Sequence, residues 1–278
     1  MKHSSTFKTA ILLFAVALLL VSCSDSTSSA DDEGTPPEVL DFALISESIQ
    51  PDLSYFEEND PAKQARYDNY YLGRGVAIQI GYLNSLGAVY GSMPGLGLQD
   101  QDPSRKDGAW VWSFSTNDDP MYGDIMPPGH YMSMVLTARD SGDEIIWDMT
   151  ISLSNDEIKI DNYRMIDGRM SKDGNRGSWK FHHMPGASSE TGLFMEAKWN
   201  RTGDDKVDIE TKIYNEGSES NWYTYSQNGP SHVMRAGNPN STGGDIMIEW
   251  NTSTMIGYIQ QGSERFCWDS NFQDTACS

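Results

Sequence analysis

Four histidines besides His3 are the chain's first candidates for acid–base chemistry or metal binding: His130, His182, His183 and His232. His182 and His183 are neighbours on a predicted strand, so their side chains point to opposite faces and do not chelate one ion in regular geometry. The sequence has no nucleophile elbow, no zinc-protease helix motif and no glycine loop for phosphates or dinucleotides. We therefore predict no catalytic residue, no metal site and no cofactor, although carboxylates paired by folding would escape a linear search.

The first residues have the features of an export signal. Lys2 and Lys8 precede an apolar run from Thr9 to Val21, which is shorter than the about 20 residues of a membrane span. The run closes with Leu-Val-Ser-Cys at residues 20–23, which resembles the lipobox of bacterial lipoproteins. The resemblance implies that residues 1–22 are a signal peptide and that Cys23 carries a diacyl anchor. An ordinary secretory signal is the alternative.

The segment after the lipobox is predicted to be a tether. Residues 23–37 are polar and acidic and offer almost nothing apolar to bury, so we expect them to be disordered. Ser24 stands where some lipoproteins carry an aspartate that retains them in the inner membrane. The resemblance thus implies a bacterial cell envelope protein of the outer membrane, and it leaves open which side the protein faces.

Two cysteines remain once Cys23 is assigned to the anchor. Cys267 and Cys277 lie close together in sequence, and in an oxidising envelope we expect them to form a disulfide. A zinc site is the alternative, but no histidine stands beside this pair.

The charge of the chain limits its partners. Removing residues 1–22 takes away two of the 20 basic residues and none of the 40 acidic ones, which leaves a net charge of −22. Such a charge disfavours nucleic acid and anionic membrane surfaces. We expect contact with the membrane only through the lipid anchor.

Residues 38–278 are predicted to form a single domain. In its first part, residues 38–103, the segment from Tyr70 to Tyr90 has apolar residues at helical spacing on more than one side, which favours a buried helix over a strand. From residue 104 to 278 apolar residues recur at every second position, as in Ile145, Trp147 and Met149. This period indicates strands with one buried and one wet face.

Glycine beside Asp or Asn punctuates these strands. The turns are predicted at residues 140–143, 172–175, 202–205, 215–218 and 227–230. These residue types reach the positive φ of hairpin turns. Calcium binding is the alternative, but no turn has the spacing of a calcium loop. The pattern predicts a mainly β fold, an antiparallel meander of about ten strands that forms a half-barrel or a lipocalin-like barrel with the helical element packed against it.

A cavity inside the curved sheet is the remaining candidate for a binding site. Its lining would be Trp110, Trp112, Met134, Trp147 and Met149, unless these side chains simply fill the core. In outline the chain is similar to envelope lipoprotein carriers and receptors with a curved sheet. We expect a non-catalytic envelope protein that binds a lipid-like ligand or an envelope protein. A purely structural or surface-display lipoprotein and a glycan-active or hydrolytic enzyme are the alternatives.

Overall fold

The computed structural model describes residues 36–37, 49–58, 69–92, 101–117, 127, 129–183 and 192–277, with helix side chains described as far as Tyr82. Internal contacts divide the chain after Pro36 into two units. The helices and strands below belong to the second unit, residues 37–278. The predicted signal peptide, Cys23 and nearly all of the predicted tether lie outside the described residues.

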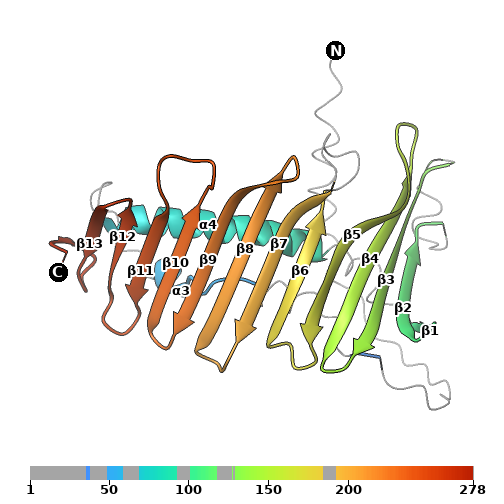
Figure 1. Ribbon diagram of the computed structural model, residues 1–278, viewed down its shortest axis with the longest axis horizontal. Coiled ribbons are helices and arrows are strands. Elements are labelled where there is room, and N and C mark those ends of the chain that lie inside the picture. Colours follow the sequence, from blue (N-terminus) through green and yellow to red (C-terminus); the bar gives the residue numbers. More distant parts are fainter. Residues whose placement is uncertain are drawn as a thin grey trace. The chain divides into compact units, whose positions relative to one another are not determined.

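One antiparallel sheet contains all strands of the described residues (Figure 1). The strands are β1 (Ser104–Lys106), β2 (Ala109–Ser115), β3 (Tyr131–Ser141), β4 (Glu144–Ser154), β5 (Lys159–Ser171), β6 (Arg176–His182), β7 (Leu193–Arg201), β8 (Lys206–Asn215), β9 (Ser218–Asn228), β10 (Ser231–Gly237), β11 (Ile246–Asn251), β12 (Ile256–Gln261), β13 (Glu264–Trp268) and β14 (Asp274–Thr275). Their order in space is their order in sequence, and the sheet is open, with β1 and β14 at its edges. The predicted mainly β meander is confirmed. It has more strands than expected, because edge strands of two or three residues show too little alternation to be recognised.

The hairpin turns adopt the backbone that their residue types predict. Each of the five predicted turns contains a glycine at positive φ: Gly142, Gly174, Gly203, Gly217 and Gly229. Hairpin loops that match the twist of their strands need this conformation, and glycine adopts it without steric cost. Turn chemistry therefore accounts for these Asp- and Asn-rich segments. Among the described residues, no group of three or more acidic, histidine or cysteine side chains is placed to hold a metal ion.

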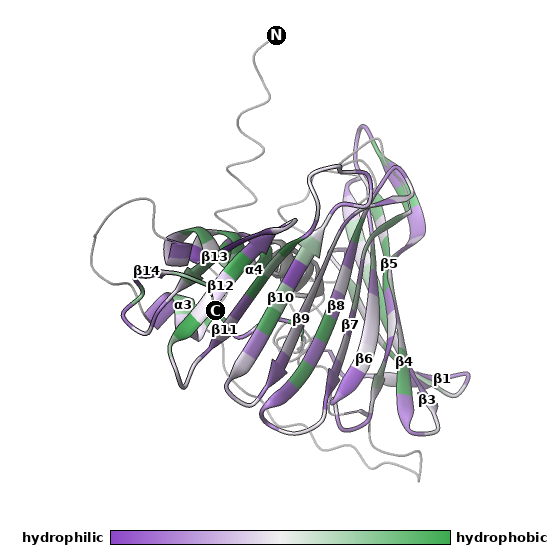
Figure 2. Ribbon diagram, turned by 60° about the vertical axis from the view of Figure 1, so that its left-hand side comes forward, coloured by the Kyte–Doolittle hydropathy of each residue, from purple (hydrophilic) through white to green (hydrophobic). Residues whose placement is uncertain are grey.

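The period-two pattern gives the sheet an inner, apolar face and an outer, polar face. Along β4, Ile145, Trp147 and Met149 are buried, whereas the residues between them are more exposed. Figure 2 shows the same alternation of hydrophobic and hydrophilic residues along the strands. Direct cross-strand pairing continues the apolar rows across the sheet, so the buried side chains form one core cluster.

Glycines make room for the large indole rings of this core. Gly257 pairs with Trp250 on one side and with Trp268 on the other. A Cβ atom at Gly257 would overlap the Trp268 ring and the carbonyl oxygen of Glu249. Gly168 lies between Trp147 and Trp179 in the same way. The rings thus lie over the bare backbone of the neighbouring strand.

Two helices lie in the described part of this unit, and the longer confirms the predicted helix but not its burial on more than one side. α4 (Asn69–Ser92) contacts β12 and β13, and α3 (Ser54–Glu58) contacts α4. The face with Tyr70, Ala77 and Ile80 is buried, whereas Leu72, Ile78 and Tyr82 are exposed, because α4 packs on the sheet with one face.

Gly73 lets α4 approach closely, since a Cβ atom there would lie 3.1 Å from the Trp268 ring. In α3, Tyr55 accepts a hydrogen bond of 2.9 Å from the indole N–H of Trp268 and donates one of 3.1 Å to the carbonyl oxygen of Met255.

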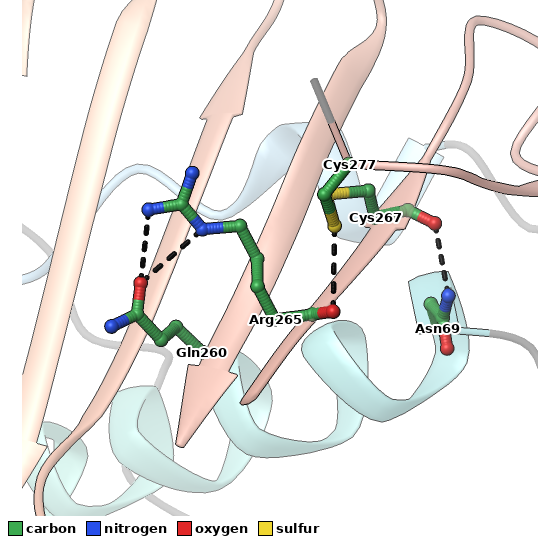
Figure 3. The surroundings of a disulfide bond; sticks show 5 residues. All are labelled: Asn69, Gln260, Arg265, Cys267 and Cys277. Carbon is green, nitrogen blue, oxygen red and sulfur yellow. Dashed lines mark hydrogen bonds between the residues drawn. A yellow bond between two sulfur atoms is a disulfide. The ribbon is translucent and has the colours of Figure 1, made fainter. Parts of the chain in front are cut away.

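The disulfide predicted for the last cysteines is formed in the structure. Cys267 on β13 is bonded to Cys277, which follows β14, with 5.3 Å between the two Cα atoms. Figure 3 shows the start of α4 beside this bridge, where the Asn69 side-chain amide donates a 2.9 Å hydrogen bond to the carbonyl oxygen of Cys267. The Asn69 backbone N–H donates to the Asp274 carboxylate at 2.7 Å. The bridge therefore fastens the last strand near the N-terminus of the long helix.

Candidate functional site

A groove of about 550 Å³ crosses the outer face of the sheet from β3 to β7. We call it the outer-face groove. It is lined by Thr137, Arg139, Ile146, Trp147, Asp148, Arg164, Asp167, Gly168, Arg169, Ser178, Lys180 and Glu196. Almost all of these residues occupy the polar positions of the period-two pattern. The groove is therefore built by the strand alternation that places the apolar residues in the core.

Two rows of cross-strand pairs form the groove. In the first row each residue lies directly opposite the next on the neighbouring strand: Thr137, Asp148, Asp167, Lys180 and Glu196. The second row lies two residues away along the strands and contains Arg139, Ile146, Arg169 and Ser178. Opposed residues have Cβ atoms about 5 Å apart, so hydroxyl, carboxylate and cationic groups follow one another across the sheet.

Irregular pairing between β4 and β5 brings a further arginine into the groove. The register shifts between Met149 and Thr150 of β4, and opposite this point β5 buries two successive residues, Met165 and Ile166. A bulge of this kind changes the direction in which the neighbouring side chains point. Arg164, just before the bulge, lies with its Nε atom 2.7 Å from the Asp148 carboxylate.

The two central carboxylates of the groove differ in their surroundings. Burial raises the pKa of Asp148 above its ordinary value; Arg164 opposes this shift, and the nearby Asp167 carboxylate adds to it. Asp167 lies 2.7 Å from the Nε2 atom of His182. Both carboxylates thus already contact a basic side chain of the chain itself. The two carboxylates therefore help to position Arg164 and His182.

Two cations of the groove have no such partner. Arg139 on β3 and Lys180 on β6 are exposed. Within the described part of the chain, no acidic group lies within ion-pair distance of either one. Arg169 has only a long contact, 3.7 Å from its Nη1 atom to the Glu144 carboxylate. Arg139 and Lys180 can therefore bind an anion without first giving up an internal ion pair, and Arg169 gives up only this long contact.

The five residues predicted to line an inner cavity lie instead in or beside the packed core. Trp112, Met134, Trp147 and Met149 are buried, and the rings of Trp112 and Trp147 stack with their centroids 6.1 Å apart. Trp110 is partly buried and packs against that cluster, and the Arg105 guanidinium lies 5.1 Å from its ring centroid. Of the five, only Trp147 borders the outer-face groove, and its side chain is 1% exposed.

The histidines occupy separate environments. His182 contacts Asp167, whereas the His183 ring packs edge-on against Phe194, with 5.3 Å between the ring centroids. His232 is buried on β10, where it stacks on Trp250 at 5.0 Å and its Nδ1 atom lies 2.8 Å from the Tyr225 hydroxyl. Burial lowers the pKa of His232.

A second hollow of about 480 Å³ lies between the segment around α3 and helix α4. Its lining includes Leu53, Ile78 and Tyr82, together with the carboxylates of Asp52 and Glu57. No lysine or arginine belongs to this lining. It therefore lacks the combination of opposite charges that distinguishes the outer-face groove.

Comparison of the chain with protein-family models, with curated proteins and with solved structures found no match. In the described residues, neither helix has both the length and the apolar character needed to cross a bilayer.

Proposed function

We propose that the chain is a non-catalytic, lipid-anchored protein of the bacterial envelope that binds a ligand in the outer-face groove. The lipobox-like sequence ending at Cys23 supports the anchor. Ser24 after it supports an outer-membrane location, as in other lipoproteins that lack the inner-membrane retention residue. The acidic segment up to residue 37 would then separate the sheet from the bilayer.

The observation that carries the binding function is the groove itself. The inner face of the sheet is occupied by the chain's own side chains, among them Trp112 and Met149 with at most 2% of their surface exposed. The outer face carries an open hollow with polar side chains directed into it from five strands. A lipid-like ligand is poorly matched to these charged walls, so we assign the groove a polar ligand.

The anchor is tested by the variant Cys23→Ala. We expect the wild-type protein to incorporate labelled fatty acid in its native host and to sediment with membranes, since a thioether-linked diacyl chain provides strong membrane affinity. The variant should take up no label and should move to the soluble fraction. Ser24→Ala, which changes the next residue and keeps the cysteine, is the matched control. Equal labelling of wild type and Cys23→Ala would remove the anchor from the proposal.

A further inference from the structure

We propose that the ligand of the outer-face groove is an acidic glycan, a polyhydroxylated chain that carries carboxylate or phosphate groups. This inference rests on the proposed binding function and names its ligand class. It follows from which groups in the groove are already satisfied, which remain available, and how they are spaced.

The available cations select for an anion. The groove is lined by four lysines and arginines and by three acidic residues, whereas the whole chain has 20 basic and 40 acidic residues. Arg164 is held by Asp148, and Arg169 makes only a long contact with Glu144, which leaves Arg139 and Lys180, and Arg169 in part, to bind incoming groups. The groove is thus a local excess of positive charge on an acidic protein. On a chain of net negative charge, such a cluster of cations is a favourable place for an anion to bind.

The carboxylates and hydroxyls of the groove select for a ligand that also donates hydrogen bonds. Asp167 and Glu196 can only accept, and each keeps lone pairs beyond its contact with His182 or Lys198. Thr137 and Ser178 can both accept and donate. A simple polyanion such as polyphosphate offers them no donor and would meet like charge. The hydroxyl groups of a sugar donate to such carboxylates and accept from the cations. A glycan that bears oxyanions therefore satisfies both kinds of group.

The shape of the groove favours an extended ligand. It runs across five neighbouring strands, and four strand spacings amount to about 19 Å. Arg139 lies on β3 and Arg169 on β5, so about 10 Å separates these two cations across the strands. Lys180 follows on β6, one strand further. A chain with anionic groups at intervals can contact all three, whereas one small anion reaches one at a time.

Binding is tested with the protein purified from its native envelope in mild detergent. The probes are a short oligogalacturonate, a phosphate-bearing oligomannoside, a neutral galactose oligomer of matched length and inorganic polyphosphate, measured by calorimetry at low and at high salt. We expect binding of at least one acidic glycan, weakening at high salt because the contacts are exposed, and no comparable binding of the neutral oligomer. Comparison of the two acidic glycans shows whether carboxylate or phosphate is the preferred group. Chromatography after incubation should recover the glycan intact, as expected of a protein that binds it without cleaving it.

A double variant locates the contacts. R139Q together with K180Q should weaken binding of the acidic glycan by about tenfold or more, because two charge-assisted hydrogen bonds are lost. The matched control, K159Q with K206Q, removes the same charge from two exposed lysines outside the groove lining. Circular dichroism of both variants should match that of the wild type.

Three results would overturn the inference. The first is that neither acidic glycan binds. The second is that polyphosphate or the neutral oligomer binds as tightly as the acidic glycans, and the third is that the control pair loses as much affinity as R139Q with K180Q. None of these results bears on the anchor, which is tested separately by incorporation of labelled fatty acid at Cys23. If Cys23 is labelled and no acidic glycan binds, the ligand class is wrong and the lipid-anchored protein remains. If the glycan binds and Cys23 is unlabelled, the anchor is wrong and the groove remains.

Discussion

Single residues of this protein show how tightly the inner face is filled. The clearest case is Gly257, whose two cross-strand partners, Trp250 and Trp268, are each 1% exposed. A side chain at this position has no free volume, because the Trp268 ring and the Glu249 carbonyl oxygen already occupy it. Interiors of this density respond to the addition of one methyl group.

The variant Gly257→Ala should therefore lower the free energy of unfolding by about 1–3 kcal/mol, the usual cost of overpacking. Chemical denaturation monitored by tryptophan fluorescence measures the change. Gly75→Ala is the matched control, because its Cβ atom would meet nothing within 4 Å on α4. Alanine there should stabilise the protein by up to about 1 kcal/mol through helix propensity. Similar effects of the two variants would contradict the packing of Trp268 over Gly257.

Buried His232 makes stability depend on pH. Burial lowers its pKa in the folded protein, whereas an unfolded chain has the ordinary histidine value of about 6.5. As the pH falls from 7 to 5, the unfolded state takes up this proton more readily than the folded state does. The contribution of His232 is therefore present in full above about pH 6.5 and is lost as the pH falls towards the folded value.

We expect a lower denaturation midpoint at pH 5 than at pH 7. In His232→Gln, which keeps a polar group near the Tyr225 hydroxyl, the difference between the two pH values should shrink even if overall stability falls. His130→Gln is the control, because the His130 side chain is 21% exposed, in contrast to buried His232, and pairs with the exposed Asp156. An unchanged pH dependence in His232→Gln would show that other groups cause it.

At the scale of elements, the sequence predicted the strands and the long helix well and the groove not at all. Alternation of apolar residues identifies β2, β3, β4, β8 and β11, and each turn glycine has the expected φ. The groove depends on which strands become neighbours and on the bulge that places Arg164 beside Asp148. Neither feature has a local signal. A search of the wet positions of consecutive strands for unpaired cations could have suggested Arg139, Arg169 and Lys180.

The edges of the sheet are short and protected. β1 has three exposed residues, two of them basic, and β14 has two residues fastened by the disulfide. Short, charged edges discourage other chains from pairing with the sheet. The bridge also keeps Asp274 beside the N-terminus of α4, where its carboxylate accepts a hydrogen bond from the Asn69 backbone.

Replacing both Cys267 and Cys277 with serine should lower the free energy of unfolding by about 2–3 kcal/mol, because the crosslink restricts a short loop in the unfolded chain. Hydrogen exchange should speed up in β13, in β14 and at the start of α4, and it should stay unchanged in β3 to β7. The wild type after reduction is a second form of the same test. Fast exchange throughout the sheet would mean that the bridge supports more than this edge.

At the scale of the whole described unit, the residues predicted to line an inner cavity are packed in or beside the core instead. Composition shows that Trp, Met and Ile suffice to line a cavity, but it does not show whether they touch one another. The stacked rings of Trp112 and Trp147 place them in the core cluster. Sequence periodicity assigns a residue to a face of the sheet, and only the three-dimensional packing distinguishes a filled face from a hollow one.

The sequential order of the strands has an evolutionary consequence. Each of the fourteen described strands pairs only with its neighbours in the sequence, so no pairing among them spans an intervening strand. Duplication or loss of one hairpin would widen or narrow the sheet by about 10 Å and leave every other strand pair in register. A hairpin gained between β3 and β7 would lengthen the groove by two strands with their outward-facing polar residues. Gain or loss of hairpins is thus a direct genetic route to outer-face grooves of graded length.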